Sequence, residues 1–92
     1  MNNLQKLELI DKIQRELKDL EQSQTAVLKK VSQIAAHNIT LGAQLLDQKL
    51  PDLQDKIDGS VGSISEISEA FSEYREKFFS DNKMDSQVDP TA

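Results

Sequence analysis

Few side chains in this sequence have the types and spacing that catalysis requires. There is one histidine, His37, and no cysteine, which excludes thiolate nucleophiles, Cys-based zinc sites and disulfides. No glycine-rich phosphate loop, nucleophile elbow or catalytic triad pattern occurs in the sequence. Acidic residues at helical spacing could gather a cation, although an acidic helix face is usually only solvated; they are Glu66, Glu69, Glu73 and Glu76. We therefore predict no catalytic, cofactor-binding or metal-binding residue, no small-molecule substrate and no enzyme activity.

The clearest pattern is instead an apolar heptad repeat, which needs a long helix to position it. Apolar residues recur three and four apart over about five heptads, the spacing of a coiled-coil seam. A strict seven-residue repeat keeps helices in contact only when they wind around one another, so the seam implies a partner helix. With Ile10 at position a, the a series is Ile10, Leu17, Gln24, Val31, Asn38 and Leu45, and the d series is Ile13, Leu20, Val27, Ile34 and Leu41.

Two features of the seam indicate what kind of partner it has. Gln24 and Asn38 either face solvent or select register and oligomeric state, because a misaligned pairing would leave their amides against apolar side chains. In the second case, Asn38→Ile should stabilise the helices and loosen the choice of partner. Leu28 at position e widens the apolar stripe, which favours more than one neighbouring helix. Charges at e and g are too few to favour a homodimer, so we predict a three- or four-helix bundle with other coiled-coil chains, a hetero-oligomer, while a homotetramer stays open.

The first helix should begin near Asn2 or Asn3 and end near Lys49. Pro51 lacks a backbone N–H and biases Leu50 towards an extended conformation, so the helix must end, kink or restart there. Because no glycine or asparagine adjoins Pro51, we predict a kink or short break at this point rather than a hairpin.

Helical spacing continues beyond Pro51 in a shifted register. The apolar residues of this second series are Leu53, Ile57, Val61, Ile64, Ile67, Phe71, Tyr74 and Phe78. The stretch from Gly59 to Gly62 is either a turn that creates a helical hairpin or part of one continuous helix. We predict an all-α fold in which residues 1–80 form an elongated coiled-coil or helical-bundle segment and residues 81–92 form a disordered acidic tail.

Composition and charge restrict the classes of partner. Residues 1–49 carry seven Lys/Arg and six Asp/Glu, whereas residues 50–92 carry four and ten, and the net charge is −5. An acidic second half with scattered basic residues argues against direct binding of nucleic acid. The sequence has no signal-peptide pattern and no run of about 18 apolar residues, so we expect a cytoplasmic protein without a membrane span. With four aromatic residues among 92, the chain alone can bury only a thin core.

A family resemblance runs over residues 14–78. It is carried by a Leu-x-x-Leu pattern followed by Ser-Gln and spaced apolar residues, and by a similar spacing further on; the residues are Leu17, Leu20, Ser23, Gln24, Leu28, Val31, Asn38, Lys49, Leu50, Ile57, Val61 and Ile64. In these features the chain resembles the snapin- and pallidin-like small coiled-coil subunits of the lysosome-related-organelle biogenesis complex and of BORC. The resemblance implies a scaffold subunit of an elongated complex in endosomal or lysosomal traffic, held peripherally on those membranes through its complex.

We therefore predict a non-enzymatic structural subunit of a hetero-oligomeric coiled-coil complex. Its partner interface comprises the a and d series, Leu28, and the apolar series from Leu53 to Phe78. Two alternatives stay open. One is a short helical subunit of a spindle or kinetochore complex, since the chain also resembles the subunits of the fungal DASH complex. The other is a small bacterial helical regulator that blocks one partner protein.

Overall fold

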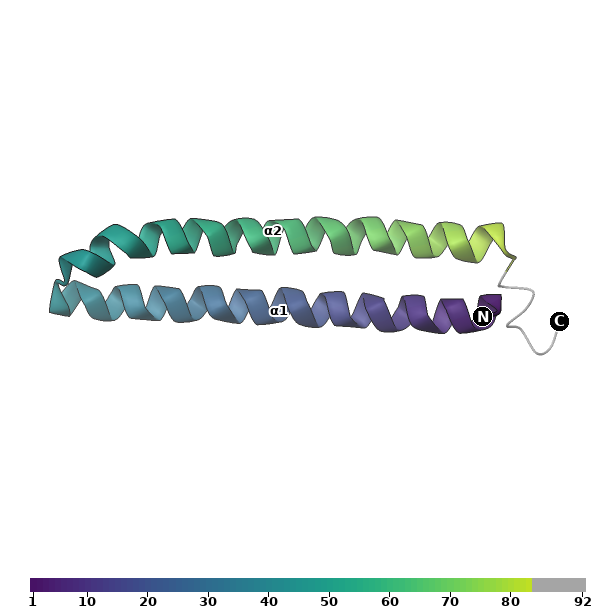
Figure 1. The fold of residues 1–92 in the computed structure, drawn as a ribbon, viewed down its shortest axis with the longest axis horizontal. Coiled ribbons are helices and arrows are strands. Elements are labelled where there is room, and N and C mark those ends of the chain that lie inside the picture. Colours follow the sequence, from purple (N-terminus) through teal and green to yellow (C-terminus); the bar gives the residue numbers. More distant parts are fainter. Residues whose placement is uncertain (84–92) are drawn as a thin grey trace.

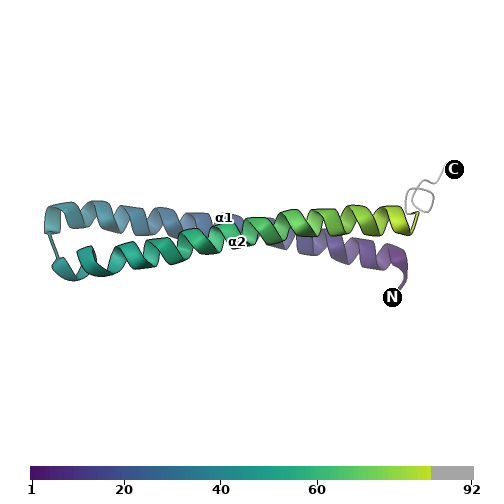
Figure 2. The same cartoon turned by 90° about the horizontal axis from the view of Figure 1, so that it is seen from above.

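Two long antiparallel helices make up the structure. The computed structural model describes residues 1–83, in which α1 spans Asn3–Leu41 and α2 spans Gln44–Asp81. The helices lie side by side along their length (Figure 1), and seen from above they cross at a shallow angle, as supercoiled helices do (Figure 2). The molecule is a rod of 67 × 19 × 18 Å. The predicted all-α class is confirmed.

Capping interactions define the outer ends of both helices. Asn2 caps α1 in a capping box: its side chain accepts the Gln5 N–H at 2.8 Å, and the Gln5 side chain accepts the Asn2 N–H at 3.0 Å. The predicted start near Asn2 is therefore confirmed. At the other end, the Asn82 N–H donates to the Phe78 carbonyl at 3.2 Å just after α2 ends at Asp81. Residues 84–92 of the predicted disordered tail lie outside the described residues.

The chain reverses direction in a two-residue turn of Gly42 and Ala43. The predicted end of the first helix near Lys49 is wrong, because α1 ends at Leu41. Gly42 takes the left-handed conformation, with φ 71° and ψ 31°, which glycine adopts without a Cβ clash. The Gly42 N–H donates to the Asn38 carbonyl at 2.6 Å. The molecule is therefore a helical hairpin whose reversal lies at Gly42.

Of the predicted kink or short break at Pro51, the structure shows only a bend (Figure 1), because α2 continues through the proline. The proline ring removes the N–H that would have bonded the Asp47 carbonyl. The first turns of α2 lie at an angle to the rest of the helix (Figure 1), so a local bend accommodates the proline.

The helix also runs unbroken through Gly59 and Gly62, so the turn considered there is absent. Both glycines are exposed, and a Cβ built on either would meet no heavy atom within 4 Å. Each lowers the helix propensity of α2 by about 1 kcal/mol relative to alanine. Contact with α1 does not require them.

The hairpin interior is thin. Among residues 1–83, the buried apolar side chains are Leu7, Ile10, Val31 and Ile64. Most other residues between the helices are only half-buried. Small scaffolds with so little core have a small margin of stability unless something else covers them.

Candidate protein-docking surface

One side of each helix is used inside the hairpin. α1 faces α2 with its a and e positions, and these buried or half-buried residues are Leu7, Ile10, Gln14, Leu17, Glu21, Gln24, Leu28, Val31, Ala35 and Asn38. The corresponding residues of α2 are Ile57, Val61, Ile64, Ser68, Phe71, Arg75 and Phe78. Both sets keep the spacing of three and four that helix pairing requires. The second helix of the same chain is therefore the partner of the a series.

Polar contacts within this seam fix how the two helices align. The Gln14 side-chain amide donates to the Ser68 carbonyl at 3.1 Å and to the Ser68 hydroxyl at 3.2 Å. Ser68 is buried, and the Gln14 Oε1 atom is buried without a hydrogen-bond partner. An unpaired buried oxygen is unfavourable. This contact therefore aligns the two helices but lowers the stability of the hairpin.

A second polar contact joins the helices near their outer ends. The Arg75 guanidinium pairs with the Asp11 carboxylate at the edge of the seam, where both side chains are about one third exposed, at 35% and 36%. The hydrogen bond to Asp11 raises the pKa of Arg75 further above its usual range, and partial burial opposes this. Because the pair is solvated, it contributes alignment more than stability.

Asn38 holds the turn together. Its side-chain oxygen accepts the Ala43 N–H at 2.9 Å, and its amide nitrogen donates to the Ala43 carbonyl at 3.2 Å and to the Asp47 carboxylate at 2.8 Å. Asn38 is buried, at 4% exposure. The amide at this a position is therefore fully engaged by its own chain, and it holds Ala43, the residue that precedes α2.

The d series of α1 remains uncovered. Its five residues are between 36% and 73% exposed; they are Ile13, Leu20, Val27, Ile34 and Leu41. Residues seven apart lie on nearly the same line of a helix, so these side chains form one apolar row beside the seam. On the other side of the seam, position b of α1 is mostly polar, with Asp11, Lys18, Thr25, Ser32 and Ile39.

α2 adds a second row to the same face. Exposed apolar side chains of α2 at heptad spacing are Leu53, Ile67 and Tyr74. A single groove is lined from α1 by Leu9 and Ile13 and from α2 by Phe71, Tyr74 and Phe78, which shows that the two rows flank one face. We call the eight side chains of the two rows the open stripe: Ile13, Leu20, Val27, Ile34, Leu41, Leu53, Ile67 and Tyr74.

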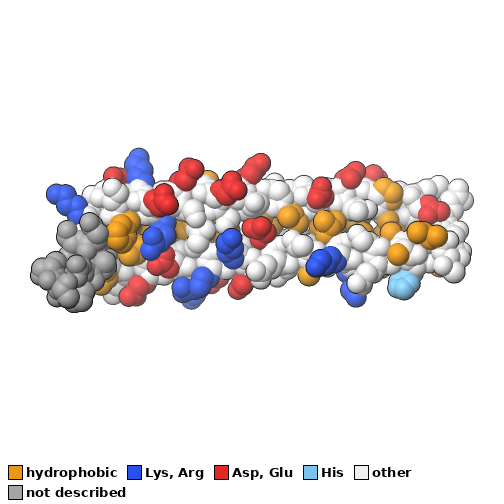
Figure 3. Space-filling model, turned by 180° about the vertical axis from the view of Figure 1, so that it is seen from behind, with side chains coloured by type: hydrophobic (Ala, Val, Ile, Leu, Met, Phe, Trp, Pro, Cys, Tyr) orange, Lys and Arg blue, Asp and Glu red, His pale blue; other side chains and the backbone are white. Residues whose placement is uncertain are grey.

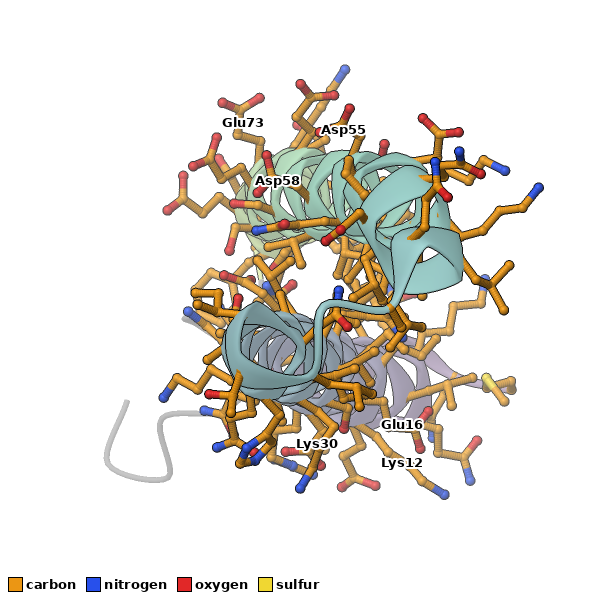
Figure 4. All side chains as sticks on the ribbon, turned by 90° about the vertical axis from the view of Figure 1, so that its left-hand side faces the viewer. Lys12, Glu16, Lys30, Asp55, Asp58 and Glu73 are labelled. Carbon is orange, nitrogen blue, oxygen red and sulfur yellow. The ribbon has the colours of Figure 1, made fainter. Side chains whose placement is uncertain are left out.

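Charge is divided between the two helices. α1 carries six Lys/Arg and five Asp/Glu, whereas α2 carries four and nine. In the face drawn in Figure 3, acidic side chains gather over α2 and apolar ones appear in separate patches between the helices. Seen along the rod from the turn, Asp55, Asp58 and Glu73 point away from α1, and Lys12 and Lys30 point away from α2 (Figure 4). Charge therefore covers the outer sides of the hairpin.

The predicted interface residues fall into three groups. Ile10, Val31, Asn38 and Ile64 are buried within the hairpin, and half-buried beside them are Leu17, Gln24, Leu28, Ile57, Val61, Phe71 and Phe78. The open stripe holds eight more. Leu45, predicted at position a of the first helix, lies instead in the first turn of α2 and is 64% exposed. Contact of any of these residues with another chain remains a prediction.

Gln14, Ser68 and the Asp11–Arg75 pair were not among the predicted site residues. A signal for Ser68 is present in the sequence, because it replaces a large apolar residue between Ile64 and Phe71 on the inner side of α2. No comparable signal marks Gln14 or Asp11, since glutamine and aspartate are ordinary residues on exposed helix faces.

Two kinds of feature are absent from residues 1–83. No helix there is long and apolar enough to cross a membrane. No three His, Asp or Glu side chains come together in a group that could hold a metal ion in this part of the chain.

Neither a protein-family model, nor a curated protein, nor a solved structure matches this chain. The resemblance to snapin- and pallidin-like subunits therefore remains a prediction from the residues that carry it.

Proposed function

We propose that this protein is a non-enzymatic assembly subunit, a helical hairpin whose open stripe packs against helices of other polypeptide chains. The observation that carries the proposal is the exposure of eight apolar side chains in two heptad-spaced rows on one face. Exposed apolar side chains gathered on one face in this way mark protein-interaction sites.

The amount of exposed apolar surface supports docking over solvation. Complete burial of a Leu, Ile or Val side chain contributes about 1.5–3 kcal/mol. Covering eight side chains that are 36–73% exposed would thus provide on the order of 10 kcal/mol before the cost of association. The thin interior makes this contribution large beside the hairpin's own stability.

The heptad spacing of the stripe indicates the chemistry of the partner. Side chains seven apart in two parallel rows match the apolar face of one helix or of a helix pair, because knobs and holes repeat at the same interval. We therefore propose helical partners in a three- or four-helix bundle.

A role in endosomal or lysosomal traffic is the finer part of the proposal and rests on the resemblance of residues 14–78 alone. It places the complex in the cytoplasm, peripherally on those membranes.

The experiment that tests the docking function compares two double variants of the tagged, full-length chain in its source cells. Leu20→Asp with Ile34→Asp places two charges in the open stripe. Lys18→Asp with Ser32→Asp is the matched control, because these exposed b positions have the same spacing on the opposite side of α1. After a high-salt wash, we expect the wild-type and control chains to keep their helical partners, identified by mass spectrometry and confirmed by reciprocal tagging, and the stripe variant to lose them. Equal retention by both variants would show that the stripe is not the docking surface.

A further inference from the structure

We infer that the open stripe takes an acidic amphipathic helix of another polypeptide chain, one whose apolar face is flanked by Asp and Glu, and that lysines beside the stripe select it. This inference deepens the proposed function and rests on it. It names the charge of the partner, which the apolar rows by themselves do not determine.

Each apolar row of the open stripe has an outer edge on the side away from the seam. Residues three and four positions after a row residue lie on either side of it, one turn further along the helix. The residue four positions on lies in the seam, as Val31 does after Val27, so the residue three positions on lies at the outer edge. We call these exposed positions the border: Leu9, Glu16, Ser23, Lys30 and His37 in α1, and Lys49, Lys56, Ser63, Ala70 and Lys77 in α2. Figure 4 shows Glu16 and Lys30 on the side of α1 turned away from α2.

Lysine is concentrated at this border. α2 has four basic residues; Arg75 lies in the seam, and the three lysines all stand at border positions. None of the nine acidic residues of α2 stands there. With Lys30 of α1, the border holds four lysines and one acidic residue, Glu16, although the whole chain has a net charge of −5. The open stripe is therefore edged with positive charge on an otherwise acidic protein.

The hairpin itself does not use the border lysines. Among the described residues the ion pair joins Asp11 to Arg75, and no border lysine reaches a carboxylate at ion-pair distance. Lys77 and Tyr74 line one surface groove, and Lys6 lines the neighbouring groove between the two rows. These ammonium groups therefore stand beside the exposed apolar side chains, where a docked helix would bring its flanking residues.

The charge of the border determines which helix fits. In paired helices, the residues beside the apolar seam form the interhelical ion pairs that set the choice of partner. Aspartate or glutamate on the flanks of a docked helix would meet lysine, whereas lysine or arginine would meet like charge. A second copy of this chain would bring the same lysines to the contact. The border therefore favours an acidic helix of different sequence.

The charges just outside the border favour a helix over an anionic membrane surface. Three residues beyond border positions of α2 stand Asp52, Glu66 and Glu73, all exposed. A flat anionic surface wide enough to meet the lysines would also meet these carboxylates and be repelled by them. A single helix, about 10 Å across, that lies between the two rows would reach only the border.

Synthetic helices of defined charge test the inference on the purified full-length chain. Three labelled peptides of four heptads share one leucine seam and carry glutamate, glutamine or lysine at every flanking position; each is used at nanomolar concentration, so that it does not pair with itself. We expect the glutamate peptide to bind at least about tenfold more tightly than the glutamine peptide, and the lysine peptide to bind most weakly. Salt at about 1 M should remove most of this difference. Equal affinities, or no binding of any peptide to about 100 µM chain, would overturn the inference.

A matched pair of triple variants shows whether the preference comes from the border. The border variant replaces the three lysines of α2: Lys49→Glu, Lys56→Glu and Lys77→Glu. The control replaces three exposed lysines of α1 outside the border: Lys12→Glu, Lys18→Glu and Lys29→Glu. Both variants change the net charge equally, and circular dichroism checks that both remain helical. We expect the control to keep the preference for the glutamate peptide and the border variant to prefer the lysine peptide. The same preference in both variants would overturn the inference.

Three further outcomes separate this inference from the docking function. If all peptides bind equally and Leu20→Asp with Ile34→Asp abolishes their binding, the docking function stands and the inference falls. If no peptide binds and this stripe variant keeps its partners in source cells, both fall. Equal peptide affinities together with binding to phosphatidylserine vesicles that the border variant loses would assign the border to a membrane surface, and this result would also overturn the inference.

Discussion

The two sides of α1 differ in how much of their apolar surface the hairpin covers. The side towards α2 mixes apolar residues with Gln14, Gln24 and Asn38, and it is largely covered. The d side is apolar at five successive heptad positions and remains exposed, from Ile13 to Leu41. The hairpin thus uses the more polar side of the helix for its own fold and leaves the more apolar side open.

This difference shows how one heptad repeat serves two contacts. Polar residues can be tolerated between helices of one chain, because the turn already holds the helices together and sets their alignment. An intermolecular contact has no such tether, and it must offset the entropy of association with apolar burial. The polar and apolar residues are distributed between the two sides of α1 as that requirement predicts.

The largest expected effect contrasts two valines, one on each side of α1. Val31→Asp places a charge in the seam, where Val31 is 5% exposed, and should destabilise the hairpin by about 3–5 kcal/mol. Val27→Asp alters only the open stripe, so it should leave the hairpin's melting temperature nearly unchanged and should abolish the co-purification of helical partners with the tagged chain. Circular dichroism melts measure the first effect, and co-purification measures the second. An equal drop in melting temperature in both variants would abolish the distinction between the two sides.

Next in size is the contrast between the two polar a residues. Asn38→Ile removes three hydrogen bonds at the turn and should destabilise the hairpin by about 2–3 kcal/mol, opposite in sign to the expectation from the heptad pattern alone. Gln24 makes no side-chain hydrogen bond within the described residues and is half-buried, so Gln24→Ile should stabilise. Chemical denaturation of each variant shows whether its free energy of unfolding rises or falls. Stabilisation by Asn38→Ile would show that the turn network has little energetic role.

A smaller contrast concerns glycines at the turn and in α2. Gly42→Ala forces a side chain into the left-handed region and should cost about 1–2 kcal/mol. Gly62→Ala lies in a helix with open space around its Cβ and should stabilise by about 1 kcal/mol. Thermal melts of the pair compare them directly. Weaker assembly of the Gly62 variant, despite a more stable hairpin, would reveal a partner on the outer side of α2.

The smallest expected effect lies in the polar part of the seam. Gln14→Leu with Ser68→Ala removes both partners and the unpaired Oε1 atom together, so stability should be unchanged or rise by up to about 1 kcal/mol. Gln14→Leu alone should stabilise the hairpin less than the double substitution, because the buried Ser68 hydroxyl then loses its partner. Denaturation of the single and double variants measures the coupling. A large loss in the double variant would mean that the contact stabilises the fold as well as aligning it.

The sequence was sufficient to predict helices, their spacing and an apolar seam, because heptad periodicity is a local property. It could not tell which helix pairs with which side, since a tethered helix and a foreign helix require the same spacing at positions such as Val31 and Ile34. For this reason the sequence left Asn38 as either a solvent-facing or a partner-selecting residue, whereas its side chain bonds Ala43 and Asp47 of its own turn.

Boundaries were predicted less well, and single residues explain why. Gly42 follows the apolar Leu41 as the first glycine in the chain, which is a signal for the end of a helix. Pro51 is a stronger formal breaker, but its ring lies on the solvent side near the start of α2, where a bend accommodates it. Exposure of a proline is a tertiary property that the local sequence does not contain.

The measurement that tests the central claim most directly is the reactivity of single cysteines in the native assembly. Val27→Cys probes the open stripe, and Ser32→Cys is an exposed control on the other side of α1 in a chain that has no other thiol. If the stripe is covered by helices, Val27→Cys should be alkylated at least about tenfold more slowly than Ser32→Cys, and the difference should vanish in denaturant. Equal rates in the native assembly would contradict the assignment of the stripe as the docking surface.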